Sequence, residues 1–319
     1  MNIKKIGLTA LAASLVSFSA NAGEMTVSGA ASISVGGYSA GAMANTPKTF
    51  SMGNQFTVSG GGELDNGMTV ALSMQIDIGV PFDDHSLTIS SDEMGTFKFN
   101  GHGGSSATTS IDASVAGDIW DGFDGAAAVA VGVTGAALKD SGPGDNSVLY
   151  TLPSIMDGLS VFASLNPQES AVNETETGYG ATYTGIEGLP VSYATTDIES
   201  GATATSGDHT AMKVSYAYGP VTVGYSNSDH DTGTASSDTK LTAYNIAYTV
   251  SDELSVSYGS EELSVGGTTV DAEYTAVVVA YTSGGMTITG KMENADNVDN
   301  SNNANADQEF WGLTAAFAF

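Results

Sequence analysis

Apolar residues alternate with small or polar ones along many short segments of this chain. In residues 68–77 the apolar set is Met68, Val70, Leu72, Met74 and Ile76. The same two-residue period recurs in residues 221–226, 241–250, 254–259 and 310–319. This period is typical of β-strands whose two faces meet different surroundings. Long apolar stretches with the 3.6-residue period of a helix are missing, so we expect an all-β fold.

The connections between these segments fall into two length classes. Seven short turns, rich in Gly, Asp, Asn and Pro, lie at 64–67, 91–95, 154–158, 185–188, 218–220, 251–253 and 283–285. Eight longer polar stretches lie between them, near 37–48, 78–85, 101–146, 166–177, 197–208, 229–239, 263–271 and 295–307. Fifteen connections predict sixteen strands. An even number places both termini at the short-turn end, where the first and last strands can pair.

Closing such a strand array into an antiparallel barrel satisfies every backbone hydrogen bond without leaving an edge. A transmembrane barrel presents its apolar face outward and its polar face inward, whereas a secreted soluble all-β surface protein would do the reverse. Three features favour the transmembrane barrel: the segregated loop lengths, the aromatic residues near strand ends, and the composition of the second face. That second face consists of Gly, Ser, Thr and Ala and includes Lys98, Lys213 and Lys291. A row formed by Trp311, Leu313, Phe317 and Phe319 is predicted to face lipid on the closing strand.

The first 22 residues have the pattern of a secretory signal peptide. Lys4 and Lys5 precede an apolar run over residues 6–18, and small residues follow at Ala20 and Ala22. The run is too short to span a bilayer, so we expect cleavage after Ala22 and export. The predicted domains are the signal peptide, 1–22, and one barrel domain, 23–319.

The charge balance limits the partners that the chain can bind. It carries 36 acidic residues against eight basic ones, all of them lysines, and it has no cysteine. Nucleic acid is excluded as a partner, because too few cationic groups are present to neutralise phosphates. Small cations are favoured, and no disulfide supports the fold.

Three segments resemble those of Gram-negative general porins, in particular the sixteen-stranded porins of alphaproteobacteria. They are "MTVSGAASISVGG" (25–37), "MGTFKFNGHGG" (94–104) and "FWGLTAAFAF" (310–319). The resemblance implies an outer-membrane homotrimer that lets small hydrophilic solutes and ions diffuse passively and carries no catalytic site. It implies that the long third loop folds into the lumen as a constriction. It also implies contact with outer-membrane lipid and lipopolysaccharide, and a terminal aromatic read by the barrel-assembly machinery.

The third loop, 101–146, is the longest connection and the predicted constriction loop. Its carboxylates are the candidate constriction residues, Asp112, Asp118, Asp121 and Asp124, with Lys98 and Lys213 as candidates on the facing wall. The alternative is a solvated acidic surface loop. No cofactor is required, although Asp118 and Asp121 are also candidates for binding calcium.

General porins set a cluster of arginines opposite this acidic loop, and this chain has no arginine. Carboxylates without counter-charge attract cations and repel anions, so we expect a cation-selective channel. The alternative within transport is a substrate-selective porin, for which Trp120 and Phe123 are the aromatic candidates along the path. Small outward residues on the first strand, at Gly29, Ala31, Ile33 and Val35, suggest a subunit interface on the first and last strands.

Three other patterns resemble chemical sites, and each lacks a feature that such a site requires. "GYSAG" (37–41) matches the nucleophile motif G-x-S-x-G around Ser39, but no amphipathic helix follows it. The four histidines fall in predicted loops and lack metal-ligand spacing: His85, His102, His209 and His230. The acidic run 293–309 lacks the glycine and spacing of an EF-hand loop. We therefore expect no enzyme activity.

Overall fold

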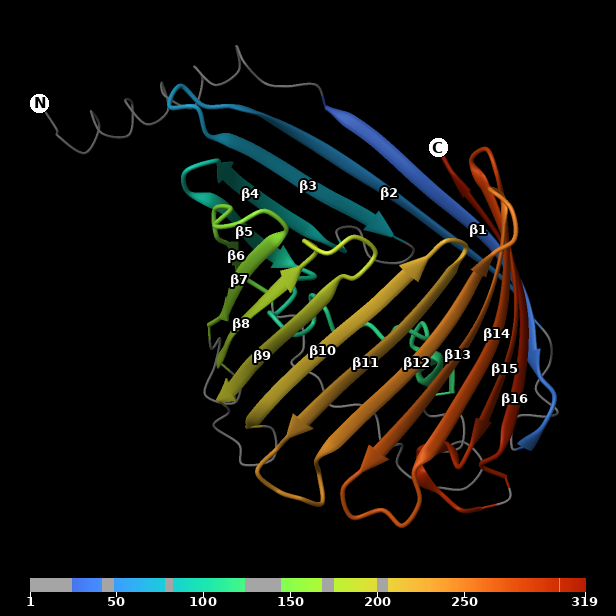
Figure 1. The fold of residues 1–319 in the computed structure, drawn as a ribbon. Coiled ribbons are helices and arrows are strands. Elements are labelled where there is room, and N and C mark those ends of the chain that lie inside the picture. The colour runs from blue at the N-terminus through green and yellow to red at the C-terminus, as the bar shows by residue number, and fades with distance from the viewer. Residues whose placement is uncertain are drawn as a thin grey trace, which may run out of the picture.

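The structure is a computed structural model and describes residues 25–41, 49–77, 83–123, 145–167, 175–199, 206–303 and 305–319. Within these residues, sixteen antiparallel strands form one closed barrel (Figure 1). This confirms the fold class and strand number expected from the alternation. The predicted signal peptide, 1–22, lies outside the described residues, and no described helix is long and apolar enough to cross a membrane.

The strands follow one another around the barrel in chain order. They are β1 (Thr26–Tyr38), β2 (Thr49–Glu63), β3 (Thr69–Asp77), β4 (His85–Ser91), β5 (Gly95–His102), β6 (Ser147–Thr151), β7 (Leu159–Asn166), β8 (Thr175–Tyr183), β9 (Val191–Glu199), β10 (Gly207–Tyr218), β11 (Val221–Asp231), β12 (Thr239–Thr249), β13 (Leu254–Val265), β14 (Ala272–Ser283), β15 (Met286–Asp296) and β16 (Gln308–Ala318). Two short 3₁₀ helices are η3 (Ile119–Phe123) and η4 (Val298–Asn300).

The barrel closes where β1 pairs with β16. Ala31 lies opposite Phe317 and Val35 opposite Leu313 in this antiparallel register. The amide of Gly29 donates to the carbonyl of Phe319 at 2.8 Å, and the amide of Phe319 donates back at 3.0 Å. The last residue therefore belongs to the closing ladder, which leaves no strand edge unpaired at the seam.

Short and long connections lie at opposite ends of the barrel. The turn between β10 and β11 spans only residues 219–220, whereas the connection from β5 to β6 spans 103–146. In Figure 1 the short turns and the C-terminus lie at the top and the long connections at the bottom. The four histidines, expected in loops, instead lie within β4, β5, β10 and β11, because these strands extend further toward the long-loop end than the alternation indicated.

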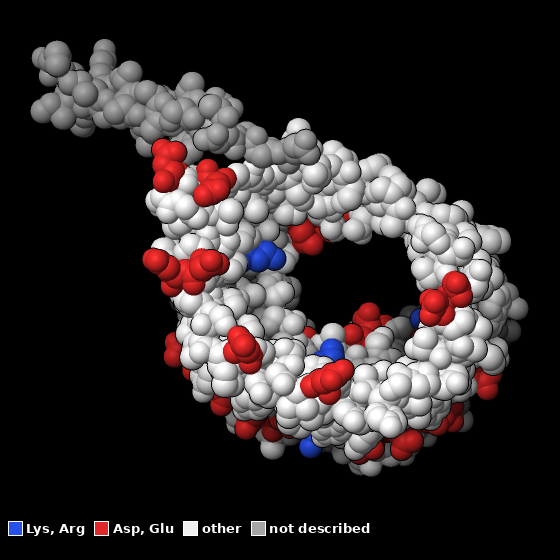
Figure 2. Space-filling view, turned by 45° about the horizontal axis from the view of Figure 1, so that its top comes forward, with Lys and Arg blue, Asp and Glu red and all other residues white. Residues whose placement is uncertain are grey.

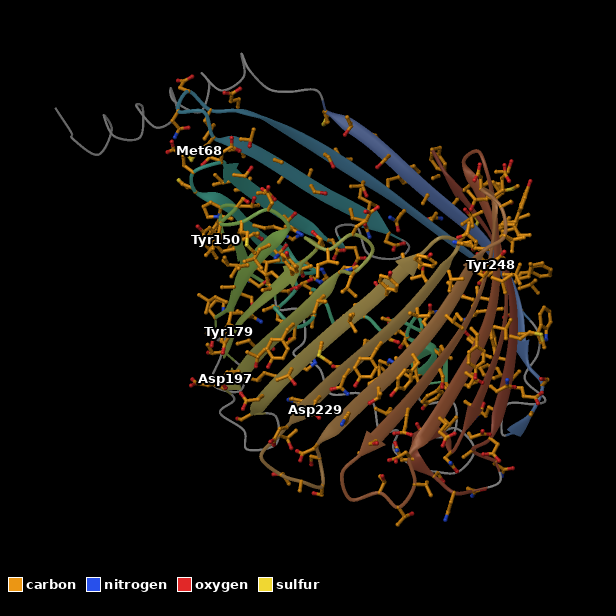
Figure 3. The ribbon with its side chains drawn as sticks, viewed as in Figure 1. Met68, Tyr150, Tyr179, Asp197, Asp229 and Tyr248 are labelled. Atoms are coloured by element: carbon orange, nitrogen blue, oxygen red, sulfur yellow. The ribbon has the colours of Figure 1, made fainter. Side chains whose placement is uncertain are left out.

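The apolar set of each strand faces outward. On β12, Tyr244, Ile246 and Tyr248 are 58%, 49% and 49% exposed, and Tyr179 and Tyr248 stand on the outside of the barrel in Figure 3. Leu313, Phe317 and Phe319, predicted to face lipid, are exposed on the outer face as well. A soluble sandwich would bury these side chains in a shared dry core, so that alternative is excluded.

Candidate functional site

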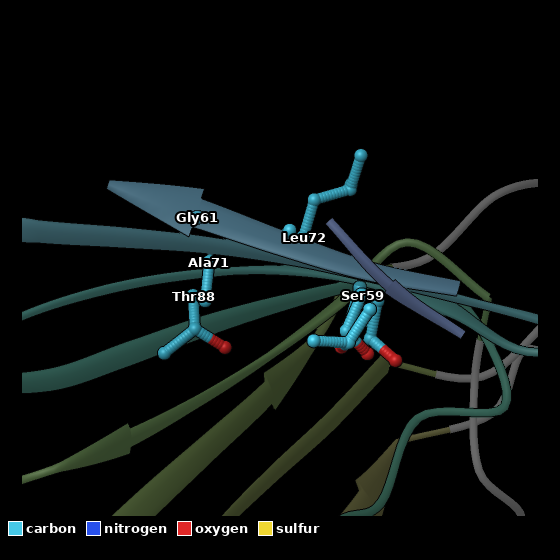
Figure 4. A pocket seen from close by; sticks show the side chains of 9 residues that line it. Ser59, Gly61, Ala71, Leu72 and Thr88 are labelled. Carbon is cyan, nitrogen blue, oxygen red and sulfur yellow. The ribbon is translucent and has the colours of Figure 1, made fainter. Parts of the chain in front are cut away.

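One sector of the inner wall is lined by small hydroxyl-bearing residues. Around a hollow of about 250 Å³ near the short-turn end, β2, β3 and β4 contribute Ser59, Ser73, Ser86 and Thr88. Figure 4 shows Leu72 on one side of the sheet, and Ser59 and Thr88 on the other. Alternation thus places hydroxyl groups on the lumen side of strands that present aliphatic side chains outside.

Residues 103–123 of the longest connection run along another sector of the inner wall. The amide of Ala107 donates to Ser164 Oγ on β7 at 2.8 Å. Further along, the amide of Val115 donates to Ser226 Oγ on β11 at 3.1 Å. Both serines alternate in sequence with outward-facing residues, so this segment contacts the lumen side of the wall (Figure 1).

Helix η3 holds the far part of this segment against β13 and β14. The amide of Trp120 donates to Glu261 Oε2 at 2.9 Å, and Glu261 is 1% exposed. Phe123 is fully buried. The centroid of its ring lies 5.9 Å from the ring centroid of Tyr274 and 6.0 Å from that of Tyr38. Tyr38 on β1 also donates its hydroxyl to the carbonyl of Gly122 at 2.7 Å. The segment therefore extends from β7 around to β1.

Two inner glycines make room for this close contact. A Cβ at Gly259 on β13 would lie 2.8 Å from Ala116 Cβ, and one at Gly224 on β11 would lie 3.0 Å from Val115 Cβ. A side chain larger than that of glycine at either position would push the segment toward the centre of the lumen.

Three of the predicted constriction carboxylates lie on this segment. Asp118 has a left-handed backbone (φ 51°), and its Oδ1 accepts the amide of Ser114 at 2.9 Å. Asp121 is exposed, and Asp112 is half-buried, with its amide bonded to the carbonyl of Thr108. Asp124 lies outside the described residues.

The two candidate lysines occupy different places. Lys213 on β10 donates from Nζ to the carbonyl of Ala113 at 2.6 Å, so it bonds the segment itself. Lys98 is half-buried on the inner face of β5, where it pairs with Thr88 of the hydroxyl-lined sector. Figure 2, which brings the short-turn end forward, shows lysines and acidic residues around an open lumen.

Sequence reasoning missed two inward glutamates. Glu261 anchors η3, and Glu293 on β15 accepts a 2.9 Å bond from Lys291 Nζ, which lies 5.0 Å from the Phe310 ring centroid. Each glutamate is followed or preceded by an exposed outward residue: Glu262 follows Glu261, and Met292 precedes Glu293. The two-residue period alone could have placed both in the lumen.

Ser39, the nucleophile of the G-x-S-x-G pattern, follows the end of β1. Its hydroxyl donates to Glu309 Oε2 at 2.9 Å. Residues 42–48, where a nucleophile elbow would require a helix, lie outside the described residues.

A family model described as Gram-negative porin matches residues 7–281. No curated protein matches the sequence significantly.

Solved structures share the fold at low sequence identity. An anion-selective porin from Comamonas acidovorans is 14% identical, with a TM-score of 0.67 over 93% of this chain and 99% of that one. OmpT of Vibrio cholerae lacking loop L8 is 15% identical, with a TM-score of 0.64 and coverage of 93% and 99%. A mutant of the Rh. blastica porin is 15% identical, with a TM-score of 0.61 and coverage of 93% and 100%.

Proposed function

Because the chain belongs to the Gram-negative porin family, we propose that it is an outer-membrane channel for passive diffusion of small hydrophilic solutes and ions. The observation that carries this proposal is the closed barrel with exposed apolar residues outside and a polar lumen within. Such a barrel satisfies its backbone in lipid and leaves an aqueous path through the membrane. Transport through it needs no covalent chemistry and no energy source, so the proposed function includes no enzyme activity.

Residues 101–146 form the proposed constriction, which narrows the lumen and limits the size of the solutes that can pass. Support comes from residues 103–123, which are bonded to the inner face of several strands. Its carboxylates Asp112, Asp118 and Asp121, with Asp124 further along the chain, supply negative charge at the narrowing. Lys98 and Lys213 are the lysines proposed to face the ion path.

The proposed selectivity is for cations. With 36 acidic residues, eight lysines and no arginine, the chain has little positive charge to offset the carboxylates of the constriction. The two inward glutamates add little to this field, because Glu261 is buried beneath η3 and Glu293 is paired with Lys291. The sign of the field depends on the side chains rather than on the fold, since a Comamonas protein of the same fold is described as anion-selective.

The remaining proposals concern assembly and surroundings. Residues 1–22 are proposed as the signal peptide, and the barrel is proposed to assemble as a homotrimer within outer-membrane lipid and lipopolysaccharide. Small outward residues on β1, Gly29 and Ala31, support an interface on the first and last strands. The terminal Phe319 is the proposed signal for the barrel-assembly machinery. Asp118 and Asp121 remain the proposed calcium ligands.

A second candidate is a channel selective for neutral polyhydroxyl solutes. The hydroxyl groups of Ser59, Ser73, Ser86 and Thr88 on one wall favour it, because they can donate to and accept from such solutes. Of the two aromatic candidates, only Trp120 is partly exposed. Phe123 is fully buried against the wall and cannot line the path, which corrects the expectation for that residue.

Reconstitution of the purified protein in a planar bilayer tests these proposals. Single channels should appear as discrete conductance steps. In a KCl gradient, the reversal potential should have the sign expected when K⁺ permeates more readily than Cl⁻. A reversal potential that favours chloride would contradict cation selectivity, and an absence of steps would contradict the channel. Saturable block by one neutral sugar would support the second candidate.

A further inference from the structure

At the long-loop end of the barrel, residues from three connected strands bring carboxylates around an imidazole. Asp83 and Asp84 precede β4, and His102 is the last residue of β5. One ligand atom of each lies within 4.8 Å of those of the other two. His102 Nδ1 lies 3.7 Å from Asp84 Oδ1, and its Nε2 lies 3.8 Å from Oδ1 of Asp145, just before β6.

The backbone holds these groups in place without a ligand. The amide of Asp83 donates to the carbonyl of Gln75 at 3.0 Å, and the amide of Gln75 donates to the carbonyl of Asp84 at 2.7 Å. The two aspartates therefore continue the β3 ladder rather than hanging from a free loop. Preorganised backbone of this kind lowers the cost of fixing side chains around a ligand.

A register shift directs His102 toward the aspartates. His85 pairs with His102, whereas the next pair is Ser86 with Asn100, so Gly101 is an extra residue on β5. Bulges of this type re-aim side chains at the rims of barrels. Gly103 follows with φ +66°, and a Cβ there would overlap the Asp84 carboxylate. Glycine at this position thus lets the carboxylate approach the end of β5.

The arrangement is chemically incomplete as it stands. His102 Nδ1 is shielded from solvent and has no hydrogen-bond partner among the described residues. Three carboxylates within reach of one imidazole repel one another, and a cation bound between them would offset that repulsion. Nitrogen together with carboxylate oxygen is a donor set that suits zinc and related transition metals, whereas calcium takes oxygen ligands.

We propose that Asp83, Asp84 and Nδ1 of His102 form a binding site for a divalent transition-metal ion of the zinc type. Oδ1 of Asp145, 3.8 Å from Nε2 of His102, favours the tautomer that carries its proton on Nε2 and leaves Nδ1 free to coordinate. A carboxylate behind a coordinating histidine commonly plays this part. Three protein ligands leave a further position for water. The ion would join the β3–β4 connection to both ends of the β5–β6 connection, where residues 103–146 leave and re-enter the wall.

Calorimetric titration of the folded full-length mature chain with Zn²⁺ tests the proposal. Millimolar Mg²⁺ is included to occupy carboxylates that bind hard cations elsewhere on this acidic surface. We expect one saturable Zn²⁺ per chain. His102→Gln and the double variant Asp83→Asn, Asp84→Asn should each weaken binding by at least ~10-fold, the scale seen when even an outer partner of a metal site is removed.

Two matched variants serve as controls. His85→Gln removes the imidazole paired with His102, and Asp157→Asn removes a carboxylate at the short-turn end; both should bind Zn²⁺ within about threefold of the unmodified chain, a change smaller than the loss of one ligand. Binding that is lost in His85→Gln but kept in His102→Gln would overturn the assignment. The absence of saturable Zn²⁺ binding above the Mg²⁺ background would overturn the site itself.

Electron paramagnetic resonance of the Cu²⁺-loaded protein gives a second readout that does not depend on affinity. A single coordinating imidazole should produce nitrogen superhyperfine coupling, and this coupling should disappear in His102→Gln. If His102→Gln does not fold, the same spectrum is recorded for the double variant Asp83→Asn, Asp84→Asn. Loss of the Cu²⁺ signal in that variant supports the site. An unchanged spectrum in a folded variant of either kind refutes it.

Discussion

The backbone amide of Trp120 donates a 2.9 Å hydrogen bond to Oε2 of Glu261, which is 1% exposed on the inner face of β13. This bond joins η3 to the barrel wall at a point 141 residues away in sequence. The proposed constriction is therefore held by a buried carboxylate rather than by its own connection to β5 and β6 alone.

Glu261→Ala should loosen η3, because the amide of Trp120 loses its acceptor in a place that water reaches poorly. Leaving a buried donor unsatisfied costs about 1–3 kcal/mol. We expect a lower temperature for the heat-induced mobility shift in gel electrophoresis and noisier single-channel currents. Glu262→Ala is the matched control, since Glu262 is exposed on the outer face of the same strand. Equal effects of the two variants would show that Glu261 does not anchor the segment.

Gly259→Val should displace the segment where Ala116 packs against β13. A Cβ at this position already lies 2.8 Å from Ala116 Cβ, and overpacking of this kind typically costs about 1–3 kcal/mol. The expected result is a changed unit conductance with an intact barrel by circular dichroism. Gly290→Val on β15 is the control, because a Cβ there meets nothing within 4 Å. Conductance that is unchanged in Gly259→Val would contradict the position of residues 115–117.

Asp121→Asn should reduce the preference for cations, because it removes an exposed carboxylate from the segment that lines the lumen. A single charge about 4 Å from a passing ion in water contributes about 1 kcal/mol. Its removal should therefore lower the permeability ratio of K⁺ to Cl⁻ by roughly twofold to fivefold. The ratio is measured from reversal potentials in a KCl gradient. High salt should shrink the difference between variant and parent as screening increases. Asp157→Asn, in a short turn, should leave the ratio unchanged, and a larger effect there would refute the assignment.

Ile246→Lys and Asn245→Lys place the same charge on opposite faces of β12. Ile246 is exposed on the outer face, so its replacement by lysine should destabilise the barrel by about 2–4 kcal/mol where lipid meets the wall. Asn245 faces the lumen, where water solvates the added charge, and its variant should fold with nearly the parental yield. Refolding yield in lipid vesicles compares the two. A greater loss for Asn245→Lys would reverse the assignment of the faces.

The two-residue period was sufficient to predict most of the fold. It placed Tyr244, Ile246 and Tyr248 on one face of β12, and the number of connections predicted the number of strands. Each of these properties depends on neighbours in sequence or on a count of turns. Local patterning therefore determines the barrel to a large extent.

The path of the long connection could not be predicted in the same way. Phe123 fits between Tyr38 and Tyr274, and Ala116 fits over Gly259, through contacts between residues far apart in the chain. The aspartates were identifiable as an acidic cluster, but no local pattern shows that Asp118 bonds the amide of Ser114. Nor does sequence spacing bring His102 to Asp84, because a register shift between β4 and β5 does so.

Cysteine scanning along β12 tests the central claim, that outward residues meet hydrocarbon and inward residues meet water. The chain has no cysteine, so single substitutions from Ala243 to Tyr248 report without background. In lipid vesicles, a charged thiol reagent should label positions 245 and 247 but not 243, because Ala243 is only 1% exposed. Spin labels at 244, 246 and 248 should be accessible to oxygen and protected from a polar relaxation agent. The opposite alternation, or equal labelling at all six positions, would contradict an aqueous lumen enclosed by a lipid-facing wall.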